Sequence, residues 1–191
     1  MKVALTGWGG FLATKLRTAT DIEWTEDRNN CDMLILMGSP TFTDAELDQH
    51  DAQVMHQYVR ETIRIIDRFD GPVIFASTTG VDDIQLDHRG STSYNLAKLY
   101  LENYVMYNCD AWTILRIGTI ISMDPADLLL MKQDRIQPRI KRKDLANIDW
   151  EDNYLLLEHF INTTLDRIRN FKTGIVEYQL TKFTIAELTK I

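Results

Sequence analysis

The first residues of the chain, an apolar run followed directly by a glycine-rich turn, limit its fold more than any other feature. Met1–Leu5 is largely apolar, and Thr6–Ala13 follows with glycines at positions 7, 9 and 10. Val and Leu without alternation favour a strand that is buried on both faces. Gly7 and Gly10 lack a Cβ where the backbone must bend tightly or approach a ligand. The stretch therefore predicts a strand, a tight turn and the start of a helix.

A turn of this kind is suited to a pyrophosphate group. A helix that opens directly after it directs free N–H groups and the positive end of its dipole at whatever lies above the turn. Ala13 takes the third position of the dinucleotide fingerprint, where a small side chain lets the helix pack close to the strand. The same spacing also occurs in ordinary strand–turn–helix units, so its place after a strand and before a helix is what favours nucleotide binding.

Composition and charge exclude several classes of protein. The chain has 191 residues, of which 45% are hydrophobic and 26% charged, so a packed core is expected rather than disorder. Its net charge of −7 argues against a general nucleic-acid or membrane-surface binder. Cys31 and Cys109 form no paired motif, no apolar run approaches a membrane span, and the sequence opens on a predicted core strand, so no leader is expected. We expect a cytoplasmic protein without structural disulfides and without nucleic-acid or membrane partners.

The rest of the chain alternates short apolar runs with helical patterns. Strands are predicted at 22–25, 32–37, 73–79, 112–117 and 174–180, and helices at 41–70, 93–102, 152–170 and 184–188, with 80–91 as a polar loop. Strands that alternate with helices indicate an α/β fold with a parallel sheet. We expect this fold to occupy the whole chain.

The second predicted strand lies unusually close to the third. Only about 14 positions separate Thr25, at the end of the second strand, from Ser39, at the end of the third. A strand–helix–strand crossover needs about a dozen residues or more between its strands. A unit of a standard doubly wound sheet is therefore missing or abbreviated here.

Acidic and basic residues, which favour NAD and NADP respectively, both follow the second predicted strand. An acid there, such as Glu26 or Asp27, would hydrogen-bond the adenine ribose of NAD, whereas Arg28 would favour the 2′-phosphate of NADP. A solvated turn accounts equally well for each residue taken singly. The sequence leaves the choice between NAD and NADP open.

Two further charged stretches carry weaker indications. Thr43 with Glu46 forms a capping box at the start of the helix at 41–70, and the acids around His50 are ordinary for a solvated first turn, so no metal site is expected. A basic group lies within 119–150, and the sequence leaves three alternatives for it: a site for a substrate diphosphate, a solvated loop or a disordered segment. Its members are Arg135, Arg139, Lys141, Arg142 and Lys143.

The catalytic candidates are Thr78, Tyr94 and Lys98. Tyr94 and Lys98 are four residues apart on a predicted helix and so share a face. A tyrosine hydroxyl has an ordinary pKa of about 10, and a nearby ammonium group lowers it. Thr78 lies at the carboxyl end of a strand, where ligands bind in open α/β sheets. Together the three groups fit a proton-transfer site beside a hydride carrier.

These motifs resemble those of the extended short-chain dehydrogenase/reductase family, which includes nucleotide-sugar epimerases, dehydratases and dTDP-4-dehydrorhamnose reductases. Thr6–Ala13 is similar to its TGxxGFxx opening, and 73–78 to the strand that ends in a catalytic Ser or Thr. Tyr94–Lys98 with Glu102 is similar to its YxxxK helix. The strand at 115–118 and the closing segments at 147–152 and 174–188 also resemble the family, so the likeness covers nearly the whole chain.

The resemblance implies a Rossmann-like doubly wound parallel sheet, shortened, in one NAD(P)-binding domain, 1–191. Residues 119–191 would include a minimal C-terminal substrate-binding region. Tyr94 would be the acid/base, Lys98 its electrostatic partner and ribose ligand, and Thr78 the hydroxyl that orients the substrate. The implied cofactor-binding residues are Gly7, Gly9, Gly10, Phe11, Leu12, Asp27, Arg28, Gly38, Tyr94 and Lys98. By analogy, the helices at 41–70 and 92–108 would pair in a homodimer.

The chain also departs from the family pattern. Tyr58 stands where the long helix often carries Asn, and Gly38-Ser39-Pro40 replaces a segment of the His-Leu-Ala-Ala type. Thr79-Gly80 stands where 4,6-dehydratases carry Asp-Glu, so that reaction is not expected. We expect an NAD(P)-dependent oxidoreductase or epimerase that acts on a small-molecule substrate such as a nucleotide sugar. The alternative is a non-catalytic NAD(P)-binding sensor or scaffold of the same fold, which the minimal substrate region favours.

Overall fold

The computed structural model describes residues 1–38, 44–85, 93–122, 124, 151–178 and 180–184. The chain divides into two compact units, which we describe separately. The first unit comprises Met1–Arg116 and Arg167–Glu177, and the second comprises Ile117–Asp166 and Tyr178–Ile191. The prediction that the C-terminal region is not an independent domain stays a prediction.

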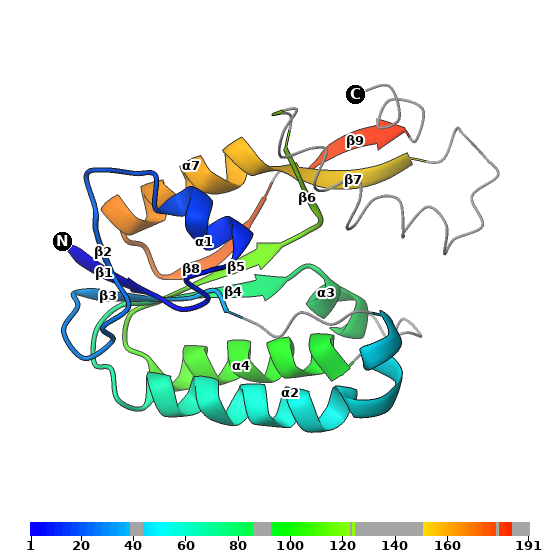
Figure 1. Cartoon of the computed structure of the whole chain (residues 1–191), viewed down its shortest axis with the longest axis horizontal. Helices are drawn as coiled ribbons and strands as arrows, with labels where there is room; N and C mark the ends of the chain where they lie inside the picture. The colour runs from blue at the N-terminus through cyan, green and yellow to red at the C-terminus, as the bar shows by residue number, and fades with distance from the viewer. Residues whose placement is uncertain (39–43, 86–92, 123, 125–150, 179, 185–191) are drawn as a thin grey trace. The chain divides into compact units, whose positions relative to one another are not determined.

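The first unit is built on a six-stranded sheet in the order β2-β1-β3-β4-β5-β8. Its strands are β1 (Lys2–Leu5), β2 (Glu23–Thr25), β3 (Met33–Leu36), β4 (Val73–Thr78), β5 (Trp112–Ile117) and β8 (Gly174–Glu177). Its helices are α1 (Phe11–Leu16), α2 (Asp44–Ile66), α3 (Gly80–Gln85) and α4 (Ser93–Asn108). Helices α2 and α4 run side by side along one face of the sheet, and α1 lies on the opposite face (Figure 1).

The sheet lacks one unit of the usual doubly wound arrangement, as the short spacing predicts. Strand β1 pairs in parallel with both β2 and β3, so that Val3 lies beside Trp24 on one side and Met33 on the other. In the usual order 3-2-1-4-5-6 a further strand lies outside the second. Here β2 is the last strand of the described sheet, and residues 26–32 lead directly from β2 to β3.

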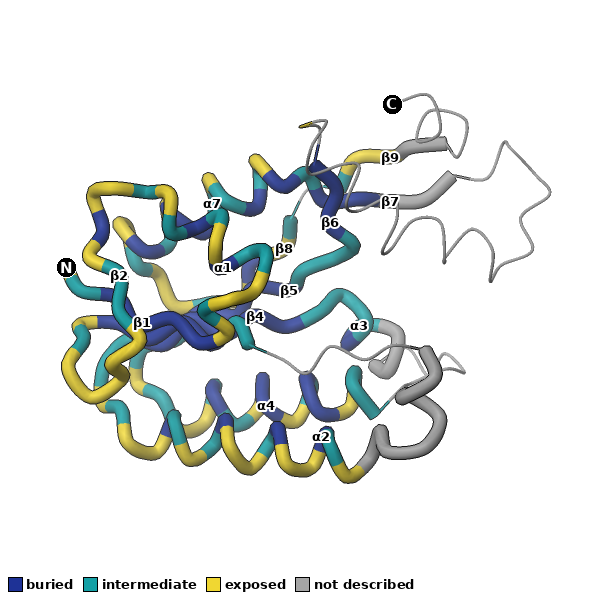
Figure 2. Tube along the Cα trace, in the orientation of Figure 1, coloured by how far each residue is buried: buried dark blue, intermediate teal, exposed yellow. Residues whose placement is uncertain are grey.

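The core of this unit lies between the sheet and the two long helices. Strand β3 is buried along its whole length and β4 along nearly all of it (Figure 2). From α2 this core receives Met55, Tyr58 and Ile66, and from α4 it receives Ala97, Leu101 and Val105. Two charged side chains of α4, Lys98 and Glu102, are buried among these apolar residues. The core therefore continues directly into the polar groups of the candidate site.

Gly7 of the glycine-rich turn lies directly against the backbone of Gly38, just beyond the end of β3. Gly7 has φ +70°, and a Cβ on it would lie 2.7 Å from the Cα of Gly38. A Cβ on Gly38 would in turn lie 2.9 Å from the nitrogen of Gly7. Thr6 fixes this approach, since its Oγ1 accepts the N–H groups of Met37 and Gly38 at 2.9 and 3.0 Å. Both positions therefore require glycine for steric reasons.

The second unit contains a small mixed sheet in the order β6-β7-β9. Its elements are β6 (Ile120–Ile121), β7 (Glu151–Leu156), β9 (Thr181–Thr184) and helix α7 (Leu157–Arg169), which belongs to this unit as far as Asp166. Strand β7 pairs in parallel with β6 and antiparallel with β9. The ring of Tyr178 packs against Phe160 at 6.0 Å between centroids and edge-on against His159 at 6.2 Å.

Several predicted element boundaries are wrong. The helix expected from 152 begins only at Leu157, because 151–156 pair with two other strands, and such pairing is not visible in local periodicity. Residues 80–85 form α3 rather than loop. The strand expected at 174–180 ends at Glu177. The capping residue Thr43, the basic group at 135–143 and most of the helix expected at 184–188 lie outside the described residues.

We expect Gly7→Ala to destabilise the protein far more than Gly9→Ala. Alanine at position 7 would adopt a left-handed backbone and meet the backbone of Gly38, at a cost of about 1–3 kcal/mol. A Cβ on Gly9 meets no atom within 4 Å, so that change should stay within about 0.5 kcal/mol. Urea unfolding of both variants measures the difference, and equal losses would contradict this account of the turn.

Candidate active site

The glycine turn lies at the point where the direction of the sheet reverses. From β1 the chain passes through α1 to β2 on one side, and it then crosses to β3 on the other side of β1. Open α/β sheets bind ligands at the carboxyl ends of their strands at such a switch point. Gly7 follows β1 and Gly38 follows β3, so the contact between them marks this point.

The outer side of the turn has room for a ligand. Gly7, Gly9 and Gly10 are exposed, and a Cβ on Gly9 would meet nothing within 4 Å. The N–H of Gly10 donates to the carbonyl of Gly7 at 2.8 Å, which closes the turn. An open glycine backbone fits the close approach of a dinucleotide pyrophosphate. Phe11 and Leu12 begin α1 directly beyond it and are half-buried.

The end of β4 and the start of α4 approach each other closely. Thr78 Oγ1 accepts the N–H of Gly80 at 3.2 Å, and a hydroxyl that accepts one bond still has its own hydrogen to donate. A Cβ on Gly80 would lie 2.6 Å from the side-chain amide of Asn95. Asn95 directly follows Tyr94 at the start of α4. Gly80 therefore allows the strand end that carries Thr78 to lie near the helix start that carries Tyr94.

Lys98 is buried beneath this region and held by protein groups. It is 2% exposed, and its Nζ donates to the hydroxyl of Tyr58 at 2.9 Å and to the carbonyl of Ala76 at 2.7 Å. The same Nζ lies 5.6 Å from the ring centroid of Tyr94 and 4.9 Å from that of Phe75. Two of its three hydrogens are therefore used, and the ammonium group remains close enough to Tyr94 to act on it electrostatically.

Burial shifts the pKa of both partners in this hydrogen bond, in opposite directions. The pKa of Lys98 falls from 10.5 to about 7, because burial disfavours the charged ammonium group, although the nearby Glu102 opposes the change. Burial raises the pKa of Tyr58, and the neighbouring Tyr94 adds to the effect. Tyr58 therefore stays protonated, while Lys98 changes its charge near neutral pH.

A buried ion network supports the same helix one turn further on. Glu102 is fully buried and forms two hydrogen bonds with Arg116 of β5, at 3.2 Å to Nε and 2.8 Å to Nη2. Arg116 also donates to Asp82 of α3 at 2.7 Å. The bond to Glu102 is the main reason that the pKa of Arg116 is raised. The network joins α3, α4 and β5, the elements around Thr78 and Tyr94.

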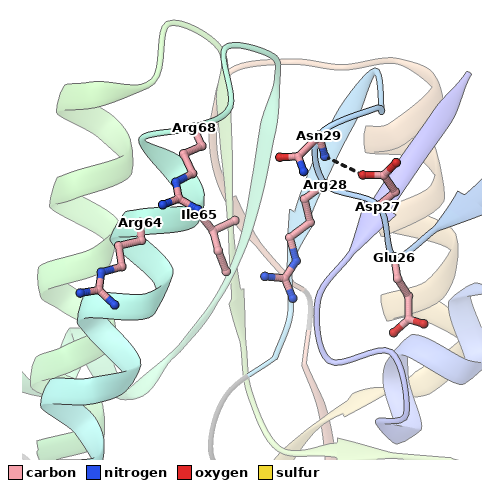
Figure 3. Close-up of a pocket in the computed structure, with 7 residues that line it drawn as sticks. All are labelled: Glu26, Asp27, Arg28, Asn29, Arg64, Ile65 and Arg68. Carbon is pink, nitrogen blue, oxygen red and sulfur yellow. Dashed lines mark hydrogen bonds between the residues drawn. The ribbon is translucent and has the colours of Figure 1, made fainter.

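Asp27 and Arg28 lie in the loop that follows β2, and both are exposed. Asp27 Oδ1 accepts the N–H of Asn29 at 3.0 Å, which fixes a local turn (Figure 3). Arg28 shares a pocket with Arg64 and Arg68 of the α2 end. The structure therefore groups this loop with the C-terminal end of α2.

As the sequence predicts, Gly7, Gly38 and Thr78 lie at the carboxyl ends of β1, β3 and β4. Tyr94 and Lys98 lie one turn apart on α4. The assignment of roles to them stays a prediction. Sequence reasoning missed the bond between Tyr58 and Lys98. A tyrosine on the apolar face of the helix at 41–70 was the available signal, since a buried phenol needs a hydrogen-bond partner. Arg64 and Arg68 gave no signal, because arginines near a helix end are ordinary.

Comparison with known proteins establishes the fold. The sequence matches no protein-family model and no curated protein. The structure is similar to that of RMD from Pseudomonas aeruginosa complexed with NADPH, with a TM-score of 0.72 and 13% identity over 100% of this chain and 82% of that one. The predicted fold class, a shortened Rossmann-like α/β sheet, is confirmed.

Two further solved structures share this fold. A hypothetical dTDP-4-dehydrorhamnose reductase from Sulfolobus tokodaii has a TM-score of 0.65 and 16% identity, over 100% of this chain and 80% of that one. WbmF from Bordetella bronchiseptica, in complex with NAD+, has a TM-score of 0.63 and 12% identity, over 99% of this chain and 76% of that one.

None of the helices in the described part of the chain is long and apolar enough to cross a membrane. The described side chains also include no group of three or more His, Cys, Asp or Glu arranged to hold a metal ion.

The shifted pKa of Lys98 predicts a particular pH dependence of stability. Between about pH 7 and 10.5 the unfolded chain binds more protons at Lys98 than the folded chain, so the contribution of Lys98 to the free energy of unfolding rises with pH. We expect the free energy of unfolding of the wild type to rise relative to that of Lys98→Met across this range. Urea unfolding at several pH values tests this. Lys172→Met, at an exposed position, is the control and should show no such trend.

Proposed function

We propose that the chain is an NAD(P)-dependent oxidoreductase or epimerase of the extended short-chain dehydrogenase/reductase type. The observation that carries the proposal is the buried Lys98 ammonium group beneath Tyr94, on a helix start that approaches the end of the strand bearing Thr78. Burying a charged lysine is costly, and a lysine that served only as a surface charge would not need to be buried. The shared fold with proteins complexed with NADPH and NAD+ supports the cofactor class.

The proposed cofactor site is the open turn at the switch point. Gly9 and Gly10 present backbone to the pyrophosphate, while Gly7 and Gly38 let the two strand ends approach closely enough to form the floor. Phe11 and Leu12 begin the helix beside it. A bound nicotinamide would supply the ability to accept or donate a hydride. The protein supplies the binding surface and moves the proton.

Four side chains have separate roles in the proposed reaction. Thr78 directs its hydroxyl hydrogen to the substrate oxygen and holds it in place. Tyr94 gives or takes the proton on that oxygen. Lys98, when protonated, stabilises the phenolate of Tyr94 from 5.6 Å away from the ring centroid. Tyr58 keeps the ammonium group in this position through a hydrogen bond of 2.9 Å.

The substrate in this proposal is a small molecule that carries a carbonyl or hydroxyl group, in the class of nucleotide sugars. The support is the similarity to a hypothetical dTDP-4-dehydrorhamnose reductase and to a UDP-N-acetylglucosamine 4-epimerase. The substrate would bind at the carboxyl ends of the strands, beside Thr78 and Tyr94.

Tyr94→Phe should lower turnover by about 10²–10⁴-fold, because it removes the proton donor of the reaction. Binding of the cofactor should remain within a few-fold of the wild type. With a panel of nucleotide sugars, the change in absorbance of NADH or NADPH measures net oxidation or reduction, and chromatographic separation of the epimeric sugars measures epimerisation, which leaves the cofactor unchanged overall. Calorimetry with NAD, NADH, NADP and NADPH measures binding.

Tyr104→Phe is the matched control, since it removes a hydroxyl from the same helix, where the phenol donates to Asp67. It should keep full turnover. Unchanged turnover in Tyr94→Phe would refute the role of Tyr94. If the wild type bound a cofactor but turned over no substrate, the sensor or scaffold alternative would be preferred. The observation that favours that alternative is that two of the three hydrogens of Lys98 bind protein groups rather than facing a ligand.

We also propose that the chain forms a homodimer through the outer surface of α2 and α4. Leu96, Tyr100 and Tyr107 of α4 are 50%, 55% and 85% exposed. A mostly apolar groove of about 500 Å³, which includes Leu96 and Tyr100, runs between α4 and Val59 and Ile63 of α2. Paired helices from two copies would cover this surface.

The double substitution Leu96→Asp and Tyr100→Asp should convert the dimer to a monomer, because charges cannot be buried unpaired in an apolar interface. Light scattering after size-exclusion chromatography measures the mass. Asn30→Asp adds charge at an exposed loop position and should leave the dimer intact. A monomeric wild type would refute the proposed interface.

A further inference from the structure

A pocket of about 330 Å³ lies between the loop that follows β2 and the C-terminal end of α2 (Figure 3). It lies apart from the glycine turn, Thr78 and Tyr94, none of which lines it. The residues around it are Glu26, Asp27, Arg28, Asn29, Arg64, Ile65 and Arg68. Three of its seven lining residues are therefore arginines, in a chain whose net charge is −7.

The three guanidinium groups have no acidic partner in the described part of the chain. Arg28, Arg64 and Arg68 are exposed, and none of their side chains forms a hydrogen bond or ion pair with a described residue. By contrast, Arg116 and Arg169 each bind a carboxylate at 2.8 Å. The arginines of the pocket therefore keep their full hydrogen-bonding capacity for another molecule.

The two carboxylates that line the pocket do not neutralise it. Asp27 is used in the local turn, where its Oδ1 accepts the N–H of Asn29. In Figure 3 the carboxylates of Glu26 and Asp27 lie on the opposite side of the loop from Arg64 and Arg68. The side of the pocket that faces α2 therefore carries positive charge alone.

The helix dipole explains only part of this arrangement. Cations near a helix C-terminus are stabilised, which accounts for Arg64 in the last turn of α2 and for Arg68 just beyond it. It does not account for Arg28, which comes from a different segment and brings a third like charge to the same pocket. Like charges in one pocket repel one another unless an anion joins them.

We propose that this pocket binds a phosphate group, with Arg28, Arg64 and Arg68 as its ligands. Guanidinium groups match phosphate oxygens in a bidentate fork, which makes arginine the preferred residue for this ligand. The amide of Asn29 adds a donor, and Ile65 gives the pocket an apolar wall. The ligand is a phosphorylated small molecule separate from the cofactor, and binding of the 2′-phosphate of NADP, which the sequence already indicates for Arg28, is the alternative outcome of the test. The site does not depend on the proposed oxidoreductase activity.

The test measures binding of inorganic phosphate to the whole chain by calorimetry at low ionic strength. The double variant Arg64→Gln and Arg68→Gln should bind phosphate about tenfold more weakly or worse, since it loses two charge-assisted contacts. Arg60→Gln is the matched control, because Arg60 is an exposed arginine one turn earlier on α2 and does not line the pocket. It should bind phosphate as the wild type does.

A second arm distinguishes the two sources of the phosphate. If the double variant binds NADPH more weakly and NADH equally well, the pocket holds the 2′-phosphate of the cofactor, and the proposal of a separate ligand is overturned. If neither dinucleotide changes while phosphate binding is lost, the ligand is a separate phosphorylated molecule. Failure of every dinucleotide to bind would refute the proposed function and leave the phosphate result intact.

The proposal is overturned if the wild type shows no saturable phosphate binding, or if the double variant and Arg60→Gln bind phosphate equally well. Thermal unfolding monitored by circular dichroism checks that each variant is folded. If the double variant does not fold, the single variant Arg68→Gln replaces it, because Arg68 lies beyond the last residue of α2. It should then show a weaker but measurable loss against the same control.

Discussion

The contact between Gly7 and Gly38 is the constraint on which the rest of the first unit depends. It brings the ends of β1 and β3 together with no side chain between them, and Thr6 fixes it by accepting two backbone N–H groups. Because these strands lie at the switch point of the sheet, the same contact forms the floor of the candidate cofactor site. A single methyl group at either position would separate the strand ends, so sheet geometry and ligand access are set by the same atoms.

Buried charge is the second organising feature, and among the described residues it lies on α4 and the adjacent strand β5. Lys98 and Glu102 are one turn apart on α4, and each is satisfied by groups from other elements: Tyr58 and Ala76 for the ammonium, Arg116 for the carboxylate. Burying charges is costly unless they are paired or hydrogen-bonded. Such a cost is typical of a site in which one group must have a shifted pKa, and Lys98 is the group shifted to near neutrality.

The shortened sheet changes what surrounds its edge. No further strand lies outside β2 among the described residues, so residues 26–32 pass directly to β3, and their loop lies against the end of α2. The loop therefore shares a pocket with Arg64 and Arg68.

The sequence by itself determined the strand–turn–helix opening, the missing crossover and the helical spacing of Tyr94 and Lys98, because each depends on local periodicity or on residue counting. It did not determine that 151–156 form a strand, since pairing with β6 and β9 overrides the local pattern. Only the tertiary structure placed Tyr58 against Lys98 and Arg28 beside Arg64. These contacts join residues that are distant in the chain, and no spacing rule within one helix or strand encodes which side chains meet across a packed core or a surface pocket.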